Sequence, residues 1–311
     1  MTPGKDSTLR HSISRMLPMV LLMILGLSWA IRLLAIKVAS EKAATPADVA
    51  LVATIGIVCI LTLTNIMRSK FPPLKRDHLR FYAIAGLLGF ALPFLVEISV
   101  APHLSASTFV MIVTSAPIWT VFLSTVFRLE PNNWYRITGI IIGFGATALV
   151  IIGLETGASN AADLAQPIWI AAAFIIPILY AAYVLYTAAA WPVGIDSLQV
   201  ALGQAVVGLL AFAIFWLTFS EHNWPARLSA FDWSIVAIVL SEILALVLFF
   251  RLARSQGGSF ATQANYIAVV SGTLIGAVYF SQSLNWLIFA GIASLIIALW
   301  LSGKSVARTA S

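Results

Sequence analysis

The sequence predicts an all-α membrane protein of ten transmembrane helices, arranged as two inverted five-helix repeats. Three observations predict it: an apolar composition, ten apolar segments of spanning length, and a pattern that recurs about 152 residues further along. Hydrophobic residues make up 60% of the 311 residues and charged residues only 10%, with a mean hydropathy of +0.97. A soluble domain carries roughly 25% charged residues, so this composition excludes an ordinary soluble protein.

The apolar segments have the length that a helix needs to cross a bilayer, about 20 residues. They must be helices, because a backbone in lipid has to satisfy its own hydrogen bonds. In the first half we place them at 17–39, 48–67, 80–102, 106–127 and 134–154, and in the second half at 167–188, 197–219, 232–253, 258–280 and 286–303. We interpret the first segment as a span and not a secretion signal, because it is long, contains Arg32 and lacks a convincing cleavage site.

The second half repeats the first in a weaker form. The stretch "ASTFVMIVTSAPIWTVFLSTVFRLEPNNWYRITGIIIGFGATALV" is echoed by "GSFATQANYIAVVSGTLIGAVYFSQSLNWLIFAGIASLIIALWLS", with Trp134 aligned to Trp286 and Gly139 to Gly291. Two copies of a unit with an odd number of spans must face opposite ways. Such inverted repeats are a recurrent design of carriers that open alternately to the two sides of a membrane.

Basic residues predict the orientation. If the N-terminus is cytoplasmic, the inner side receives 14 of the 18 Lys and Arg residues and the outer side receives three. Cytoplasmic loops carry such an excess, so ten spans with both termini inside are favoured over nine or eleven. The loop with Arg128 and Arg136 is then cytoplasmic, while its counterpart at Gln282–Asn285 has no basic residue and faces outward, as inversion requires.

These assignments divide the chain into a cytoplasmic tail (1–16), a first five-helix repeat (17–155), an external linker (156–166), a second repeat (167–303) and a cytoplasmic tail (304–311). We expect a multi-pass protein of the inner (plasma) membrane whose surroundings are the lipid bilayer. The high isoelectric point, about 9.7, is explained by this orientation, so no nucleic acid is expected as a partner. The single Cys59 excludes a disulfide framework.

The first and fourth to fifth spans resemble the drug/metabolite transporter superfamily, and within it the EamA-type ten-helix carriers. The similarity rests on "LGLSWAIRLLAIKVAS" and "SAPIWTVFLSTVFRLEPNNWYRITGIIIGFG", and the ten-span plan extends it over nearly the whole chain. The family pattern of a Trp, a Pro, an acidic residue and a Gly-rich helix reads here as Trp29, Pro117, Glu130, and Gly139 with Gly143.

The second copy departs from this pattern, with Val269 at the position of the Pro and Gln282 at that of the acidic residue. The resemblance implies export or exchange of small metabolites through a central cavity between the repeats. The substrate cannot be chosen from the family alone.

We therefore expect a secondary active transporter working by alternating access, an exporter or exchanger of amino acids or similar amphipathic solutes. A carrier of phosphorylated or nucleotide-linked sugars is the alternative; a membrane-embedded enzyme or a channel is a different class. The sequence has no phosphate-binding loop and no recognisable enzyme motif. Transport would thus be coupled to a proton, to a counter-substrate or to the substrate gradient, with no enzyme activity, cofactor or metal ion.

Three ionisable residues inside predicted spans, Arg32, Glu97 and Glu242, are the first candidates for substrate binding. A charge at a helix centre costs roughly 2.5–3.5 kcal/mol on insertion scales, so it usually faces a cavity or a partner. Arg32 and Glu97 lie at similar depth, and we expect them to interact and Glu242 to face the same cavity. Arg32 would bind a carboxylate or phosphate of the substrate. An acidic residue would bind an amine of the substrate or carry a coupling proton. The alternative is a permanent pair that joins helices and touches no substrate.

Aromatic residues within the spans are further candidates, because a ring can hold an apolar or aromatic ligand. They are Trp29, Trp119, Tyr180, Tyr183 and Tyr266. Helix packing is the alternative role of these rings. A second group, Pro117 with the GxxxG pairs Gly139/Gly143 and Gly272/Gly276, is assigned to helix packing or to hinges, because such glycines let helices approach closely.

Overall fold

The computed structural model describes residues 5–42, 46–128, 134–156, 167–219, 232–256, 261, 264–280 and 285–309. All regular secondary structure in these residues is helical. Seven segments among them are long and apolar enough to cross a bilayer: Leu17–Lys42, Pro46–Met67, Arg76–His103, Thr108–Val126, Pro167–Ala190, Ser197–Thr218 and Trp233–Leu252. The expected all-α membrane class is confirmed, and the count of ten spans stays a prediction.

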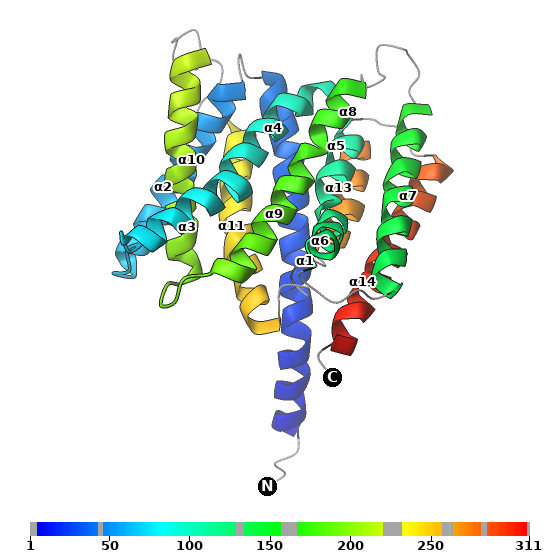
Figure 1. Ribbon diagram of the computed structural model, residues 1–311, viewed down its shortest axis with the longest axis horizontal. Coiled ribbons are helices and arrows are strands. Elements are labelled where there is room, and N and C mark those ends of the chain that lie inside the picture. Colours follow the sequence, from blue (N-terminus) through cyan, green and yellow to red (C-terminus); the bar gives the residue numbers. More distant parts are fainter. Residues whose placement is uncertain are drawn as a thin grey trace.

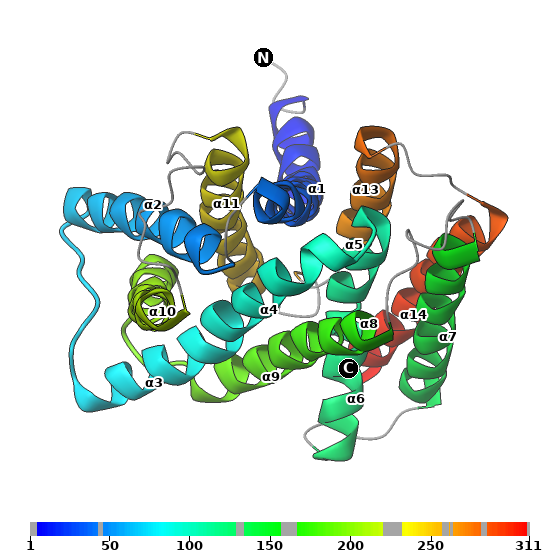
Figure 2. The same cartoon turned by 90° about the horizontal axis from the view of Figure 1, so that it is seen from above.

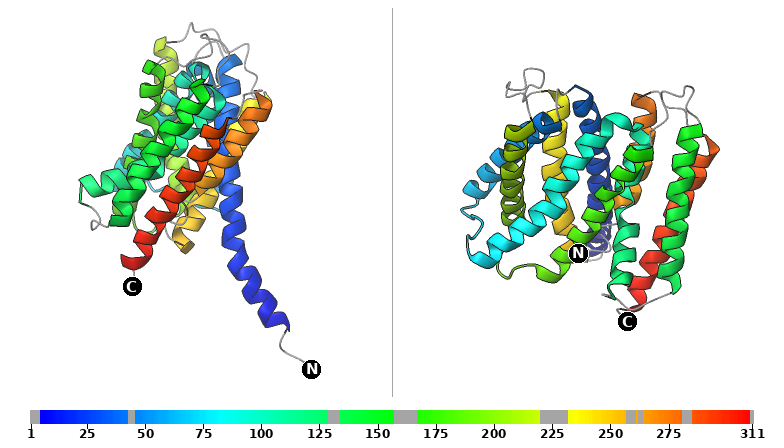
Figure 3. Two further views of the ribbon diagram at one scale, coloured as in Figure 1. Left: turned by 90° about the vertical axis from the view of Figure 1, so that its right-hand side faces the viewer. Right: turned by 45° about the horizontal axis from the view of Figure 1, so that its top comes forward.

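The first half contains α1 (Lys5–Lys42), α2 (Pro46–Met67), α3 (Arg76–Gly86), a π-helical turn η1 (Leu87–Ala91), α4 (Leu92–Val100), a 3₁₀ turn η2 (Ala101–His103), α5 (Ala106–Thr114), α6 (Ala116–Val126) and α7 (Trp134–Thr156). The second half contains α8 (Pro167–Ala173), α9 (Ile175–Ala190), α10 (Ser197–Phe219), α11 (Trp233–Gln256), α13 (Ala264–Tyr279) and α14 (Trp286–Thr309). Helix α1 begins earlier than its apolar segment, because neither glycine nor proline interrupts residues 5–17, and it projects from the bundle (Figure 3).

The helices lie side by side. The first residues of α1 and the last residues of α14 lie at the same end of the bundle (Figure 1). Seen from above, α1 lies between α11 and α13, the pair α2 and α10 lies on one side, and the pair α7 and α14 lies on the other (Figure 2). Large apolar side chains face outward, such as Leu210 and Val278, which are 62% and 84% exposed. Apolar surface on this scale suits contact with lipid.

Three of the predicted spans are interrupted, and each interruption lies just before a proline. The π turn precedes Pro93, Ser115 separates α5 from α6 before Pro117, and Phe174 separates α8 from α9 before Pro177. A proline ring removes one backbone donor and clashes with the carbonyl four residues earlier. The backbone therefore departs from a regular α-helix in three of the predicted spans.

Close helix contacts depend on glycine in α1 and at two of the predicted packing positions. A Cβ at Gly26 would lie 2.5 Å from both the Ala264 carbonyl oxygen and the Ile267 Cβ of α13. A Cβ at Gly143 would lie 2.7 Å from Ile118 Cδ1, and one at Gly272 would lie 2.6 Å from Val110 Cγ1. At Gly26 the helices could not approach so closely with a larger residue, because a backbone atom is in the way, whereas at Gly143 and Gly272 a neighbouring side chain would have to shift.

The pair α2 and α10 is joined at both ends by an aspartate. At one end Trp216 Nε1 donates a hydrogen bond to Asp48 Oδ1 (3.0 Å). At the other end Asp196 caps α10 by accepting from the backbone N–H groups of Leu198 and Gln199, and Arg68 Nη2 lies 2.7 Å from its Oδ2. Partial burial alone would raise the pKa of Asp196, but the hydrogen bonds from Arg68 and the backbone outweigh it and lower the pKa below its ordinary value.

Acid is expected to weaken this second junction. The pKa of Asp196 is lower in the folded state than the roughly 3.9 of an unfolded chain. The ionised side chain therefore contributes its full stabilisation at pH values above the unfolded-state pKa, and this contribution is lost as the pH falls through the folded-state pKa. Thermal unfolding in detergent should show Asp196→Asn below the wild type at neutral pH, with the difference shrinking between about pH 5 and about pH 2. A difference that does not depend on pH would contradict this account.

Candidate functional site

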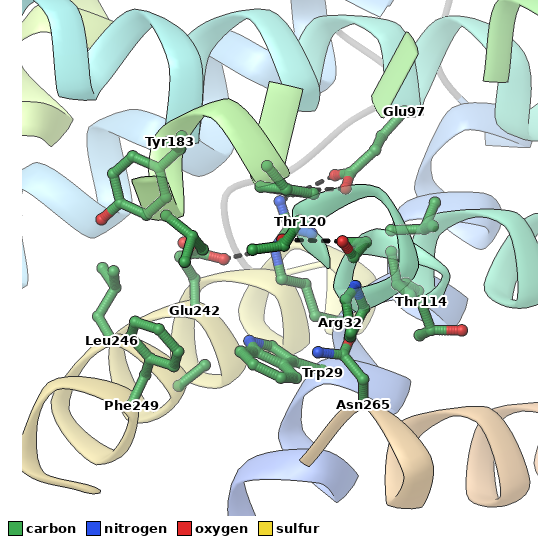
Figure 4. A pocket seen from close by; sticks show the side chains of 18 residues that line it. Trp29, Arg32, Glu97, Thr114, Thr120, Tyr183, Glu242, Leu246, Phe249 and Asn265 are labelled. Atoms are coloured by element: carbon green, nitrogen blue, oxygen red, sulfur yellow. Dashed lines mark hydrogen bonds and ion pairs between the residues drawn. The ribbon is translucent and has the colours of Figure 1, made fainter. Parts of the chain in front are cut away.

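A cavity of about 130 Å³ lies inside the bundle and is bordered by both halves of the chain (Figure 4). Helices α1, α4, α5, α6, α9, α11 and α13 and the π turn contribute to its wall. The lining residues are Trp29, Arg32, Leu33, Gly89, Glu97, Val113, Thr114, Ala116, Pro117, Thr120, Tyr180, Tyr183, Val184, Glu242, Ala245, Leu246, Phe249 and Asn265.

A charged cluster forms one part of this wall. Arg32 Nη2 lies 2.9 Å from Glu97 Oε2, and Arg32 Nε forms a second ion pair with Glu242 Oε2. Tyr180 donates its hydroxyl to Glu97 Oε1 over 2.8 Å. The expected proximity of Arg32 to Glu97 and of Glu242 to the same cavity is therefore present in the structure.

The three charged side chains are buried to different degrees. The exposed fraction of the side chain is 7% for Arg32, 0% for Glu97 and 13% for Glu242. Burial of unpaired charges is costly, and mutual pairing with additional hydrogen bonds is what makes it tolerable. The Phe94 ring adds a cation–π contact, with its centroid 5.3 Å from the guanidinium carbon of Arg32.

Six of the eight predicted binding residues line the cavity: Trp29, Arg32, Glu97, Tyr180, Tyr183 and Glu242. Trp119 is not a lining residue, because its ring packs near Phe122 and Phe174, with centroids 6.0 and 6.2 Å away. The backbone of Tyr266 belongs to α13, but its side chain lies outside the described part of the chain. Of the predicted packing residues, Pro117 also borders the cavity, whereas Gly139 and Gly276 are buried elsewhere in α7 and α13.

Several lining residues were not predicted from the sequence. Thr114 and Thr120 flank the break between α5 and α6, and their hydroxyls bond to carbonyls of their own helices. Gly89 lies in the π turn, where a Cβ would be 2.4 Å from Tyr183 Cδ2. The prolines near these positions were the available signal, since they mark where the backbone departs from a regular helix.

The hydroxyl of Tyr183 is held away from the charged cluster. It lies within hydrogen-bond distance of Gln204 on α10, 3.3 Å from Oε1 and 3.2 Å from Nε2. Tyr183 therefore presents its ring to the cavity, whereas Tyr180 presents its hydroxyl to Glu97.

The cavity extends from the cluster toward the end of the bundle that carries the termini. On α11 its lining residues run from Glu242 to Phe249, in that direction (Figure 1). On the other side of the cluster, Lys37 Nζ donates to the carbonyl oxygens of Ala101 (3.0 Å) and Leu104 (2.7 Å). These bonds tie α1 to the chain between α4 and α5 at the opposite end.

The apolar helical bundle is that of a polytopic membrane protein, and ionisable side chains around its internal cavity mark a candidate functional site. Residues 16–152 match the model of the EamA-like transporter family, which is part of the drug/metabolite transporter superfamily. The matched family is one of membrane transporters. The match spans α1 to α7, apart from the ends of α1 and α7.

The overall fold is also similar to that of a solved structure described as "Crystal structure of protein". The similarity has a TM-score of 0.65 and 16% sequence identity, and it covers 94% of this chain and 99% of the other. At this identity the likeness concerns the fold alone. A search of curated proteins gave no match.

Proposed function

We propose that the protein is a secondary transporter that moves a small amphipathic metabolite, such as an amino acid, across the inner membrane by alternating access. The observation that carries this proposal is the cluster of Arg32, Glu97 and Glu242 in the wall of an internal cavity. Ionisable residues at membrane depth mark substrate and ion pathways. In this proposal Arg32 meets the substrate carboxylate, an acidic residue meets its amine, and the aromatic wall meets its apolar part.

The size of the cavity favours a small solute. Its volume, about 130 Å³, is close to that of the roughly 150 Å³ engineered cavity that binds benzene. An amino acid side chain fits such a space, whereas a nucleotide-linked sugar is far larger. Arg32 is also the only basic residue among the described lining residues, which disfavours a doubly charged phosphate ester.

The proposed architecture is ten spans in two inverted units, residues 17–155 and 167–303, joined by an external linker. The helix contacts support it. In the two units α1 corresponds to α8 with α9, α4 to α11, and α6 to α13. The contact of α1 with α11 then has its counterpart in the contact of α9 with α4. The contact of α1 with α13 has its counterpart in the contact of α9 with α6, and all four contacts occur. Helices α2 and α10, and likewise α7 and α14, contact each other as partners on a two-fold axis would.

The aspartates that join α2 and α10 follow the same exchange. Asp48 at the start of α2 bonds to Trp216 near the end of α10. Asp196 at the start of α10 bonds to Arg68 just after the end of α2. A two-fold rotation that places α2 on α10 therefore also places the Asp48 junction on the Asp196 junction.

The proposed orientation has both termini in the cytoplasm, as the distribution of basic residues predicts. The cavity extends toward that side, and the Lys37 contacts lie on the other. In this proposal the structure represents an inward-facing carrier, closed on its external side.

Reconstitution into liposomes tests the proposal. Uptake of a panel of radiolabelled amino acids, sugar phosphates and nucleotide sugars is measured with and without internal counter-substrate and a pH gradient. We expect saturable uptake of an amino acid that rises with counter-substrate or with the pH gradient. Uptake equal to that of protein-free liposomes for every solute would refute the proposal, and rapid flux without saturation or countertransport would indicate a channel.

A further inference from the structure

The two glutamates of the cluster are not equivalent. We propose that Glu242 is an exchangeable cation site, which binds a proton in the empty carrier and the ammonium group of the substrate in the loaded carrier. This inference rests on the proposed function and narrows it to a solute with a protonated amine that is exchanged for a proton.

The first argument is the charge balance of the cavity. Its described lining residues include one cationic side chain, Arg32, and two anionic ones, Glu97 and Glu242. One guanidinium neutralises one carboxylate, so one negative charge remains on side chains that are largely buried, 0% exposed for Glu97 and 13% for Glu242. Because an uncompensated buried charge is costly, the empty site favours the binding of one monovalent cation.

The second argument is the difference in bonding between the two carboxylates. Glu97 is fully buried and has two partners on two helices, Arg32 and Tyr180. Glu242 is partly exposed to the cavity, and among the described side chains it bonds only to Arg32. A ligand that enters the cavity can therefore reach Glu242 by displacing a single contact, and it leaves the bonds of Glu97 in place.

The surroundings of Glu242 suit a cation with an apolar substituent. The charged and titratable groups facing it are Arg32 from α1, Glu97 from α4, and Tyr180 and Tyr183 from α9. The remaining polar lining side chains, from α5, α6 and α13, are neutral: Thr114, Thr120 and Asn265. Trp29 and Phe249 supply ring faces that attract ammonium groups and pack against apolar chains.

Because the proton and the ammonium group of the substrate bind the same carboxylate, the binding of one excludes the binding of the other. When the ammonium group binds, the proton leaves Glu242 for the side to which the cavity is open, and the carboxylate returns to its protonated form after the amine departs. Each cation lowers the apparent affinity for the other by the same factor, as linkage requires. A proton gradient directed inward would then drive the amine outward.

Proton binding can be measured without any substrate. Proteoliposomes on a solid-supported membrane are exposed to an acidic pH jump, and the displaced charge is recorded for the wild type, Glu242→Gln, Glu242→Asp and the control Asp77→Asn. Asp77 is an exposed acid in the first turn of α3, so its substitution repeats the chemical change away from the cavity. We expect a transient current in the wild type and the control, at least a tenfold loss in Glu242→Gln, and recovery in Glu242→Asp.

The shared site is tested with three probes of one shape: phenylalanine, phenethylamine and 3-phenylpropionate. The two amines should reduce the proton-driven current and the acid should not. Competition by the acid alone, or by none of the three, overturns the shared site. A wild-type current in Glu242→Gln protein that elutes and melts like the wild type, or no current in the wild type, overturns proton binding at Glu242.

The two proposals can fail separately. Solute uptake in the liposome panel together with an unchanged current in Glu242→Gln would retain the transporter and remove the role of Glu242. A proton current that depends on Glu242, with no uptake of any panel solute, would retain the cation site and remove the proposed substrate class.

Discussion

Arg32→Gln is expected to abolish transport and to lower the free energy of unfolding by about 3–5 kcal/mol, the cost of removing one partner from a buried ion pair. The substitution leaves Glu97 and Glu242 facing each other without a counterion, with Glu97 completely buried. Thermal unfolding in detergent and uptake in proteoliposomes measure the two effects. Arg32→Lys should retain part of the stability, because a lysine keeps the charge but cannot reproduce the two-sided contact of a guanidinium.

A triple variant separates a structural role of the cluster from a role in binding. In Arg32→Gln/Glu97→Gln/Glu242→Gln no buried charge is left without a partner, so most of the lost stability should return. Transport should remain absent, because the groups that recognise the substrate are gone. Normal transport by the triple variant at normal expression would show that the cluster only joins helices.

Gly26→Ala is expected to cost about 1–3 kcal/mol of stability, the usual penalty of overpacking. The new methyl would lie 2.5 Å from a backbone oxygen of α13, and a backbone atom cannot rotate aside as a side chain can. Helices α1 and α13 would have to separate. Because α1 carries Arg32, we also expect reduced uptake by the variant protein that still folds.

Gly145→Ala is the matched control. Gly145 lies within α7, and a Cβ there meets no atom within 4 Å, so the same change should leave stability unaltered or raise it by roughly 0.5–1 kcal/mol through helix propensity. Equal melting temperatures for the Gly26 and Gly145 variants would show that the contact between α1 and α13 is not tight in the membrane.

The charged cluster could be predicted from the sequence because charges in apolar segments are rare and helical rise fixes their depth. Arg32 and Glu97 were expected at one level, and they form an ion pair. Helix rotation about its own axis could not be predicted in the same way, because packing against neighbouring helices sets it. Trp119 and Thr120 differ by about 100° around a helix, and it is Thr120 that borders the cavity.

The interruptions of the helices were predicted only in part. Segments 80–102, 106–127 and 167–188 were each expected to be one span with a proline inside it, because neighbouring helices can cover the carbonyls that a proline frees. Each remains one spanning segment, but a π turn or a single non-helical residue lies shortly before its proline. Composition locates such a proline, but whether the helix bends or stops depends on contacts from other helices, such as the Tyr183 ring against Gly89.

Helix α1 runs without a break from Lys5 to Lys42 and carries both Arg32 and Lys37, which are about 7.5 Å apart along its axis at the helical rise. Arg32 belongs to the charged cluster. Lys37 donates hydrogen bonds to two carbonyl oxygens on the side of the cluster that faces away from the termini. A continuous helix is stiff over such a short length, so Arg32 and Lys37 keep a fixed position relative to each other and move together with α1. A turn or slide of α1 that frees Lys37 must also change the geometry around Arg32.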